Sequence, residues 1–329
     1  MPARIGILLT PEFGLTSFTS IVETLRSANT LAERALYGWT ILAERPGPVA
    51  STAGVAILAE AAPGGDDAFD MLFVPAAGNP ALFDHAGIFA WLRRLHRHGT
   101  LLAGVSGGAF LLARAGLLDG RRFTIHWEHI APLREAFPQL APRQTLYELD
   151  RGIATAAGGI ATFDLMLALI ARDHGAGFAA RVADWLLHTQ HRPGAEGQRM
   201  AAARRHDVRR DDLARVLEHM ERHAETPLDI AALARLAGMS GRQLQRLFQA
   251  QVGMSVHRHL TALRLERARI LLRQSPLAIA EVAGASGYAS ASHFSQVFRE
   301  RFGHAPREER ENEIGRSRQA SGGKGPQAL

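Results

Sequence analysis

A serine between glycines stands at position 106, in the run GVSGGAF (residues 104–110). An apolar run precedes it and a helical pattern follows, so Ser106 is predicted to lie at a sharp strand-to-helix turn, the arrangement of a nucleophile elbow. His126 follows in the run FTIHWEH. In a hydrolase, Ser106 would be the nucleophile, His126 the general base, and the amides of Gly107 and Gly108 the oxyanion hole.

The same turn could instead bind a ligand without turning it over. Amides at a helix N-terminus attract a carboxylate, and Ser106 would add a further donor. Nearby, Trp127 could contact a cation and Glu128 could pair with one, which would suit a zwitterionic amine, an amino acid or a betaine. Two other interpretations remain open: the turn binds nothing, or Trp127 belongs to the core and Glu128 faces water.

The elements that would position these residues are predicted from seven short apolar runs separated, in many places, by helical patterns. Strands alternating with helices favour a doubly wound, mostly parallel, flavodoxin-like α/β sheet, whose ligands sit at the carboxyl ends of the strands. A helix over residues 177–188 is expected to close the domain. The predicted strands cover residues 4–10, 39–44, 71–75, 101–105, 123–125, 145–149 and 153–156.

Further along the chain, one pattern occurs twice. The run PLDIAALARLAGMS (residues 227–240) is repeated by PLAIAEVAGASGYA (residues 276–289). The match continues through the following helix of each copy, which indicates an internal repeat of a supersecondary unit. Each copy is typical of a helix-turn-helix, with Gly238 or Gly287 at the turn. An all-α domain with two such units is therefore predicted.

The second helix of each copy has a buried stripe and an outward polar face. Arg and Gln can bond bidentately to guanine and adenine edges in the major groove, and Ser and His can serve as single contacts. A single copy would leave a solvated helix face as an equal alternative, whereas two copies at matched spacing favour binding to double-stranded DNA. The outward residues are Arg242, Gln243, Gln245, Arg246 and Gln249 in the first helix and Ser292, His293, Ser295, Gln296 and Arg299 in the second.

Residues 213–310 resemble the DNA-binding domain of the AraC/XylS family of transcription regulators, in which a long helix, here residues 256–273, joins two helix-turn-helix units. The stretch GYASASHFSQVFRERFGHAPREER (residues 287–310) fits the signature of that family. Because Ser292 and Ser295 are short, the second unit is expected to read bases weakly and mainly to hold the DNA backbone. The resemblance implies base-reading positions at Arg242, Gln245 and Arg246 and at Ser292, His293, Ser295 and Gln296.

Residues 4–188 resemble the class I glutamine-amidotransferase-like superfamily, in its PfpI-like branch, and the sensor domain of GlxA-type regulators. The matching stretches include GAFLLARAGLLDGRR, IHWEH and AAGGIATFDLMLALIARDHG. Enzymes of that superfamily place a cysteine at the elbow and an acid near the first strand, where this chain has Ser106 and Ser17. A serine without an orienting acid is a poor nucleophile. The resemblance therefore implies an inactive domain that binds a ligand beside Ser106 and Ser17, similar to regulators of betaine, carnitine and arginine catabolism.

Composition narrows the remaining classes. The 329 residues include no cysteine, which excludes disulfides and thiolate metal sites, and histidines with metal-ligand spacing are missing, so neither a metal nor a cofactor is expected. Apolar runs are too short for a membrane span, and a cytoplasmic protein is expected. Residues 1–190 carry 15 Arg and 17 Asp and Glu, so the positive excess lies in the remainder, as phosphate binding requires.

The sequence thus predicts a one-component transcription regulator that is controlled by a small ligand and assembles as a homodimer. Its two recognition helices are expected in successive major-groove faces about 34 Å apart. The alternatives are a serine hydrolase or amidase attached to a DNA-binding domain, and a non-specific architectural DNA binder. The predicted divisions are a sensing and dimerisation domain (1–190), a linker (191–208), a DNA-binding domain (209–310) and a disordered tail (311–329).

Overall fold

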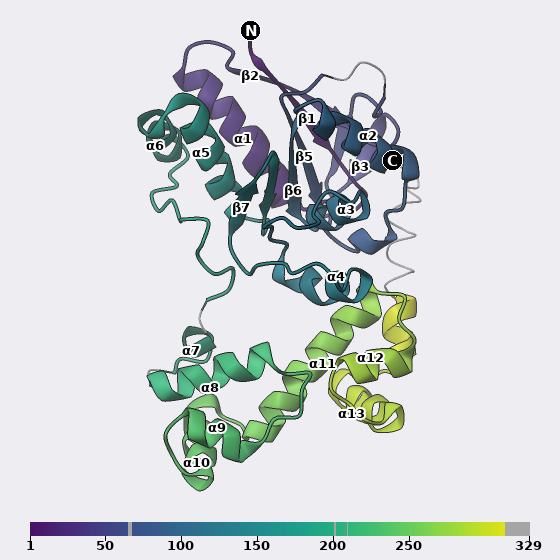
Figure 1. Cartoon of the computed structure of the whole chain (residues 1–329), viewed down its shortest axis with the longest axis vertical. Coiled ribbons are helices and arrows are strands. Elements are labelled where there is room, and N and C mark those ends of the chain that lie inside the picture. The colour runs from purple at the N-terminus through teal and green to yellow at the C-terminus, as the bar shows by residue number, and fades with distance from the viewer. Residues whose placement is uncertain (65–67, 201, 209, 313–329) are drawn as a thin grey trace, which may run out of the picture. The chain divides into compact units, whose positions relative to one another are not determined.

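The computed structural model describes residues 1–64, 68–200, 202–208 and 210–312. The chain divides into two compact units, of which the first runs from Met1 to Gln198 and the second begins at Arg199 (Figure 1). The segment expected as a linker therefore starts inside the first unit. Within the described part of the chain, every helix is too short or too polar to cross a bilayer.

The first unit is built on a six-stranded sheet in the order β2-β1-β5-β6-β8-β7. All neighbouring pairs are parallel except β7 with β8, which confirms the predicted mostly parallel sheet. The strands are β1 (Ala3–Leu8), β2 (Tyr37–Leu42), β5 (Met71–Ala76), β6 (Leu101–Ser106), β7 (Tyr147–Asp150) and β8 (Ile153–Ala156).

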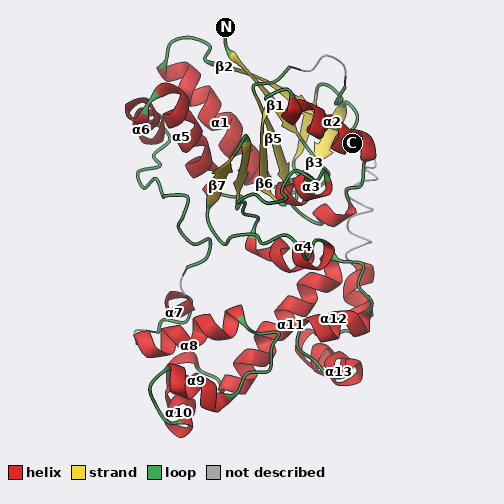
Figure 2. Cartoon of the chain, viewed as in Figure 1, coloured by secondary structure: helices red, strands yellow, loops and turns green. Residues whose placement is uncertain are grey.

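Both faces of the sheet are covered by helices, because successive residues of the inner strands point to opposite sides. Leu102 of β6 belongs to one buried cluster, and Ala103 and Val105 of the same strand belong to the other. The first cluster includes α2 (Ala86–Arg97), α3 (Gly108–Arg114) and α4 (Ile130–Ala136), and the second includes α1 (Leu15–Leu31), α5 (Ala161–His174) and α6 (Ala176–Trp185) (Figures 1 and 2).

In this unit one predicted strand is absent and one pair of strands was missed. Residues 123–125 form no strand of the sheet, and only an isolated bridge joins Thr124 to Arg143. The apolar run there reflects burial, since Phe123 and Ile125 are buried while the Thr124 amide donates to the Thr155 hydroxyl. Conversely, the antiparallel pair β3 (Gly47–Ala50) and β4 (Ala56–Ala59) was not predicted.

The second unit is all-helical, with one helix-turn-helix at each end of the long α11 (Figure 1). Gly238 and Gly287 have φ values of 66° and 85° in the turns of the two copies, a conformation that favours glycine. The serine before α10, before α11 and before α13 accepts a backbone N–H and so begins the helix. The helices are α7 (Ala202–Arg205), α8 (Asp211–Arg222), α9 (Ile230–Leu236), α10 (Gly241–Val252), α11 (Val256–Gln274), α12 (Ile279–Ala285) and α13 (Ala291–Phe302).

A further helical stretch, residues 306–312, follows α13 and closes the described chain. It includes the first two residues of the stretch expected as a disordered tail, and the remainder of that stretch lies outside the described residues. Glu309 in this helix is 4% exposed and accepts hydrogen bonds from Arg269 and Arg273, so a buried carboxylate fastens the helix to α11.

Candidate ligand pocket and nucleic-acid interface

The predicted elbow has the backbone geometry that the sequence suggests. Ser106 is the last residue of β6, and its φ of 57° lies in the left-handed region, which is strained for a residue other than glycine. A β-carbon on Gly108 would lie 1.9 Å from the carbonyl oxygen of Val74. A β-carbon on Gly158 would lie 2.5 Å from that of Ser106. The elbow therefore requires glycine on both sides, and Ser106 is left 8% exposed.

One of the two amides expected to hold an anion at this turn, that of Gly107, already has an acceptor. The Gly107 N–H donates to the carbonyl oxygen of Ala76 at 2.7 Å, which ties the elbow to the end of β5. The helix that follows, α3, has seven residues, so few peptide dipoles add at its start. These contacts do not support the role of anion donor that the sequence suggested for Gly107.

The residues expected beside the elbow have structural contacts of their own. The Ser17 hydroxyl, on α1, accepts the amide N–H of Gly159 at 3.0 Å and thus fastens the turn before α5. Glu128 Oε2 lies 4.0 Å from His126 Nδ1, beyond hydrogen-bonding distance. A β-carbon on Gly107 would lie 3.1 Å from Nε2 of His129, which places this buried histidine against the elbow. Sequence reasoning gave His129 no role, although it stands in the quoted stretch IHWEH.

A pocket of about 200 Å³ lies in the first unit beside these residues. Trp127, in a short 3-10 helix (Trp127–His129), and Ile160 are 38% and 51% exposed, so large apolar groups line it. Of the residues expected to bind a ligand, His126 and Trp127 line this pocket, whereas Ser17, Ser106, Gly107, Gly108 and Glu128 do not. The full lining is His126, Trp127, Leu146, Ala157, Gly158, Ile160, Ala161, Arg192 and Gln198.

Arg192 is held in the pocket wall by a carboxylate that sequence reasoning missed. Asp164, on α5, is fully buried. Its Oδ2 accepts hydrogen bonds from Nε and Nη2 of Arg192 at 3.0 and 2.6 Å. Its Oδ1 accepts a hydrogen bond from the backbone amide of Arg192 and lies 3.0 Å from His188 Nε2. An aspartate inside the apolar run ATFDLMLALI requires a partner, because a buried unpaired charge is costly. That pattern was the available clue.

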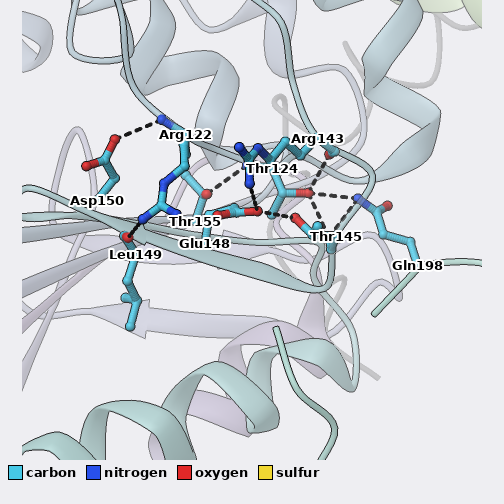
Figure 3. A network of polar contacts seen from close by, with 9 residues as sticks. All are labelled: Arg122, Thr124, Arg143, Thr145, Glu148, Leu149, Asp150, Thr155 and Gln198. Carbon is cyan, nitrogen blue, oxygen red and sulfur yellow. Dashed lines mark hydrogen bonds and ion pairs between the residues drawn. The ribbon is translucent and has the colours of Figure 1, made fainter. Parts of the chain in front are cut away.

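Gln198 is held by a second network, drawn in Figure 3. Its Nε2 donates to the Thr124 hydroxyl at 2.9 Å, the Ile125 carbonyl at 2.8 Å and the Thr145 carbonyl at 3.1 Å. Because acceptors surround Nε2, the orientation of the amide is determined by its contacts. Its Oε1 is buried and has no hydrogen-bond partner among the described residues.

In the second unit, α10 and α13 expose most of the side chains that were predicted to contact nucleic acid. In α10 the buried side chains are Leu244 and Phe248, and in α13 they are Phe294 and Phe298. The opposite faces are open to solvent, apart from Ser295, which is half-buried. The exposed predicted residues are Arg242, Gln243, Gln245, Arg246 and Gln249 on α10, and Ser292, His293, Gln296 and Arg299 on α13.

Paired helix-turn-helix units joined to an enzyme-like α/β domain define a DNA-binding transcription regulator. Residues 3–172 match the model of the DJ-1/PfpI family, and residues 233–312 match that of a helix-turn-helix domain. The chain is 46% identical over 304 residues to the HTH-type transcriptional regulator GlxA of Rhizobium meliloti (strain 1021), a match that covers 92% of this chain and 94% of that protein.

Two further relatives agree. The HTH-type transcriptional regulator CdhR of Pseudomonas aeruginosa is 40% identical over 303 residues, covering 92% of this chain and 90% of that one. A crystal structure of an AraC family transcriptional regulator from Pseudomonas putida is 30% identical with a TM-score of 0.50, covering 56% of this chain and 100% of that chain. The chain belongs to the family of regulators that join a DJ-1/PfpI domain to an AraC-type helix-turn-helix domain, which confirms the predicted family.

Proposed function

We propose that this transcription regulator is controlled by a small zwitterionic ligand, an amine, amino acid or betaine, bound in the pocket beside the elbow. The observation that carries the proposal is the composition of that pocket, where the indole of Trp127 and the guanidinium of Arg192 line the same space of about 200 Å³. An indole face attracts a cation and a guanidinium attracts a carboxylate. One small molecule with both charges satisfies both groups.

Calorimetry of the full chain against amino acids, glycine betaine and carnitine tests this proposal. A ligand whose cation contacts the indole should bind about fivefold to thirtyfold more weakly to Trp127→Ala. Trp185→Ala is the matched control, because Trp185 is 52% exposed in the same unit and does not line the pocket. The absence of heat from every compound with the wild-type protein would contradict the proposal.

For the second unit, the proposed mode of binding is base reading by α10, with α13 mainly contacting the DNA backbone. The exposed Arg and Gln side chains of α10 support this division, since both can form paired hydrogen bonds with bases. Competition between a selected DNA site and bulk DNA separates this mode from that of an architectural binder, which would release the site readily. The proposal includes a homodimer assembled through the predicted sensing and dimerisation domain (1–190), which sedimentation velocity at several concentrations tests.

One observation favours a second function. The strained φ of Ser106, 57°, is typical of a nucleophile elbow and therefore favours a serine hydrolase or amidase as the second function. Against it, the Gly107 amide is bound to Ala76, and Ser17 contacts Gly159 instead of orienting a histidine. Incubation with ester and amide substrates decides between them: turnover by the wild type that disappears in Ser106→Ala would establish the enzyme.

A further inference from the structure

The pocket wall includes a segment that leads out of the first unit, residues 188–198, here called the strap. Its first half is fastened to Asp164 through His188 and Arg192. Its second half contacts the residue just before β7, where the amide of Leu146 donates to the carbonyl oxygens of Gly194 and Glu196, each at 2.9 Å. The strap is therefore a fixed part of the pocket and not a loose connection.

Arg192 has donor capacity left over for a ligand. Asp164 binds Nε and Nη2 and holds the planar guanidinium in one orientation. The Arg192 side chain remains 35% exposed and lines the pocket. A guanidinium offers five N–H donors in a rigid fork, so a carboxylate can bind to the donors that Asp164 does not occupy. Because the orientation is already determined, little entropy is lost when the carboxylate binds.

Gln198 imposes a second requirement on the ligand. Its Oε1 is a buried acceptor without a partner among the described residues, and leaving such a group unsatisfied has a free-energy cost. A ligand N–H that reached this oxygen would remove that cost. A fully substituted ammonium, as in a betaine, has no N–H to donate. The unsatisfied acceptor therefore favours an amino acid with a free ammonium group over its trimethylated counterpart.

We propose that Arg192 and Gln198 recognise an effector that carries a carboxylate and an N–H donor, and that the strap passes this recognition to the second unit. The inference rests on the proposed function of the pocket. Oε1 is covered, so a donor can reach it only when the atoms around Gln198 shift. Gln198 is directly followed by Arg199, the first residue of the second unit. An effector that rearranges the strap thus changes the restraint on that unit, as differential binding to two arrangements requires.

Calorimetry of the wild-type full chain tests recognition without any substitution. Each amino acid that binds is compared with its N,N,N-trimethyl counterpart, which keeps the carboxylate and removes every N–H on the nitrogen. We expect trimethylation to weaken binding about tenfold or more, the usual effect of losing a hydrogen bond to a charged group. Equal affinities would overturn the role of Gln198. If no amino acid or betaine binds at all, the proposed function itself fails.

Variants test the two side chains separately. Arg192→Ala should weaken the best-binding amino acid about tenfold or more, whereas Arg45→Ala, an 87% exposed arginine in the same unit, should not. Unchanged affinity in Arg192→Ala would overturn its role. If that variant unfolds, Arg192→Lys replaces it, because lysine keeps the charge but not the fork, and its affinity should also fall.

The coupling has its own measurement. Amide hydrogen exchange of the wild type, with and without the best-binding amino acid, should change between Gly194 and Arg199, where the strap meets the second unit. Exchange that changes only around Trp127 would overturn the coupling while leaving recognition intact. The two parts of the proposal can therefore fail independently.

Discussion

The two helix-turn-helix units share a scaffold and differ in the exposed side chains of their second helices, α10 and α13. Arg246 of α10 corresponds to Gln296 of α13, and both are exposed. Gln296 donates to Glu300 at 3.0 Å, one helical turn away, whereas the residue of α10 that corresponds to Glu300 is Ala250. In the second helix-turn-helix unit, the side chain predicted to read a base is thus bound to a neighbour that carries the same sign of charge as phosphate.

A similar difference affects the serine positions of α13. The Ser295 hydroxyl donates to the carbonyl oxygen of Ala291 at 2.8 Å, and such back-bonding leaves its hydrogen unavailable to a base. The residue of α10 that corresponds to Ser295 is Gln245, which is long and exposed. The two copies share their turns and buried stripes and differ in their outward faces. This difference supports the proposal that the first helix-turn-helix unit reads bases and the second anchors the DNA backbone.

The buried interiors have diverged as well. His259, near the start of α11, corresponds to Glu309 in the last described helix, and both are 4% exposed. Burial, and then the nearby positive groups His206 and Arg205, lower the pKa of His259 to about 4 in spite of Glu221. Burial by itself would raise the pKa of Glu309, but hydrogen bonds from His304, Arg269 and Arg273 outweigh it and leave that pKa lowered. The first helix-turn-helix unit thus buries a neutral imidazole, and the second buries a paired carboxylate.

The largest effect is expected from Glu309→Leu. The substitution removes the buried carboxylate that accepts hydrogen bonds from Arg269 and Arg273, and breaking a buried ion pair typically costs about 3–5 kcal/mol. Amide exchange of α13 should accelerate strongly, while that of α10 should change little. The control is Glu311→Gln in the same helix, whose exposed pair with Arg307 should contribute less than about 0.5 kcal/mol. Unchanged protection of α13 would show that the carboxylate is not what fastens the helix.

Acid is expected to affect the first helix-turn-helix unit before the second. The pKa of His259 is lower in the folded state than its ordinary value of 6.5, so the unfolded state binds a proton more readily. The free energy of unfolding therefore has its full value above pH 6.5, where His259 is neutral in both states. It falls by about 3 kcal/mol as the pH drops towards 4. Pulsed amide labelling of α10 in a urea series at each pH measures this loss.

Two histidine variants sharpen that test. His259→Leu should remove the loss between pH 6.5 and 4, whereas His257→Leu, an exposed position on the same helix, should keep it. The carboxylate of Glu309 stabilises the second helix-turn-helix unit at pH values above the ordinary pKa of glutamate. This contribution is lost as the pH falls through the lowered pKa of Glu309 in the folded state. The second helix-turn-helix unit should therefore lose little stability between pH 6.5 and 4. Parallel losses in both units would remove the distinction between the two interiors.

For DNA binding, the decisive pair is Arg246→Ala and Gln296→Ala. Loss of a bidentate arginine should cost on the order of 1–3 kcal/mol and relax specificity at one base pair. Loss of Gln296 should cost less than about 1 kcal/mol, because its amide already has a partner in Glu300. Titrations against a site selected from random DNA, and against bulk DNA, measure both. An equal loss on both kinds of DNA would make Arg246 a phosphate contact.

The sequence predicted these features unevenly, for a physical reason. The repeat and the elbow depend on neighbouring residues, so helical periodicity and the glycines around Ser106 were sufficient to locate them. The pocket wall depends on contacts between distant segments. Asp164 signals that a partner is needed, but no spacing shows that the partner is Arg192. Likewise, Gln198 is placed by Thr124 and by two carbonyl oxygens that only the folded chain brings together.

The smallest effect should come from making the second reading helix resemble the first. Glu300→Ala reproduces Ala250, releases the amide of Gln296 and removes a negative charge from the proposed DNA face. We expect tighter DNA binding by about 0.5 kcal/mol, roughly twofold, because the charge is exposed and partly screened. Combining it with Gln296→Ala separates the two causes. If the gain persists without Gln296, it comes from charge alone and α13 is an anchor; if it disappears, the released amide reaches a base, and the two units read DNA in the same way.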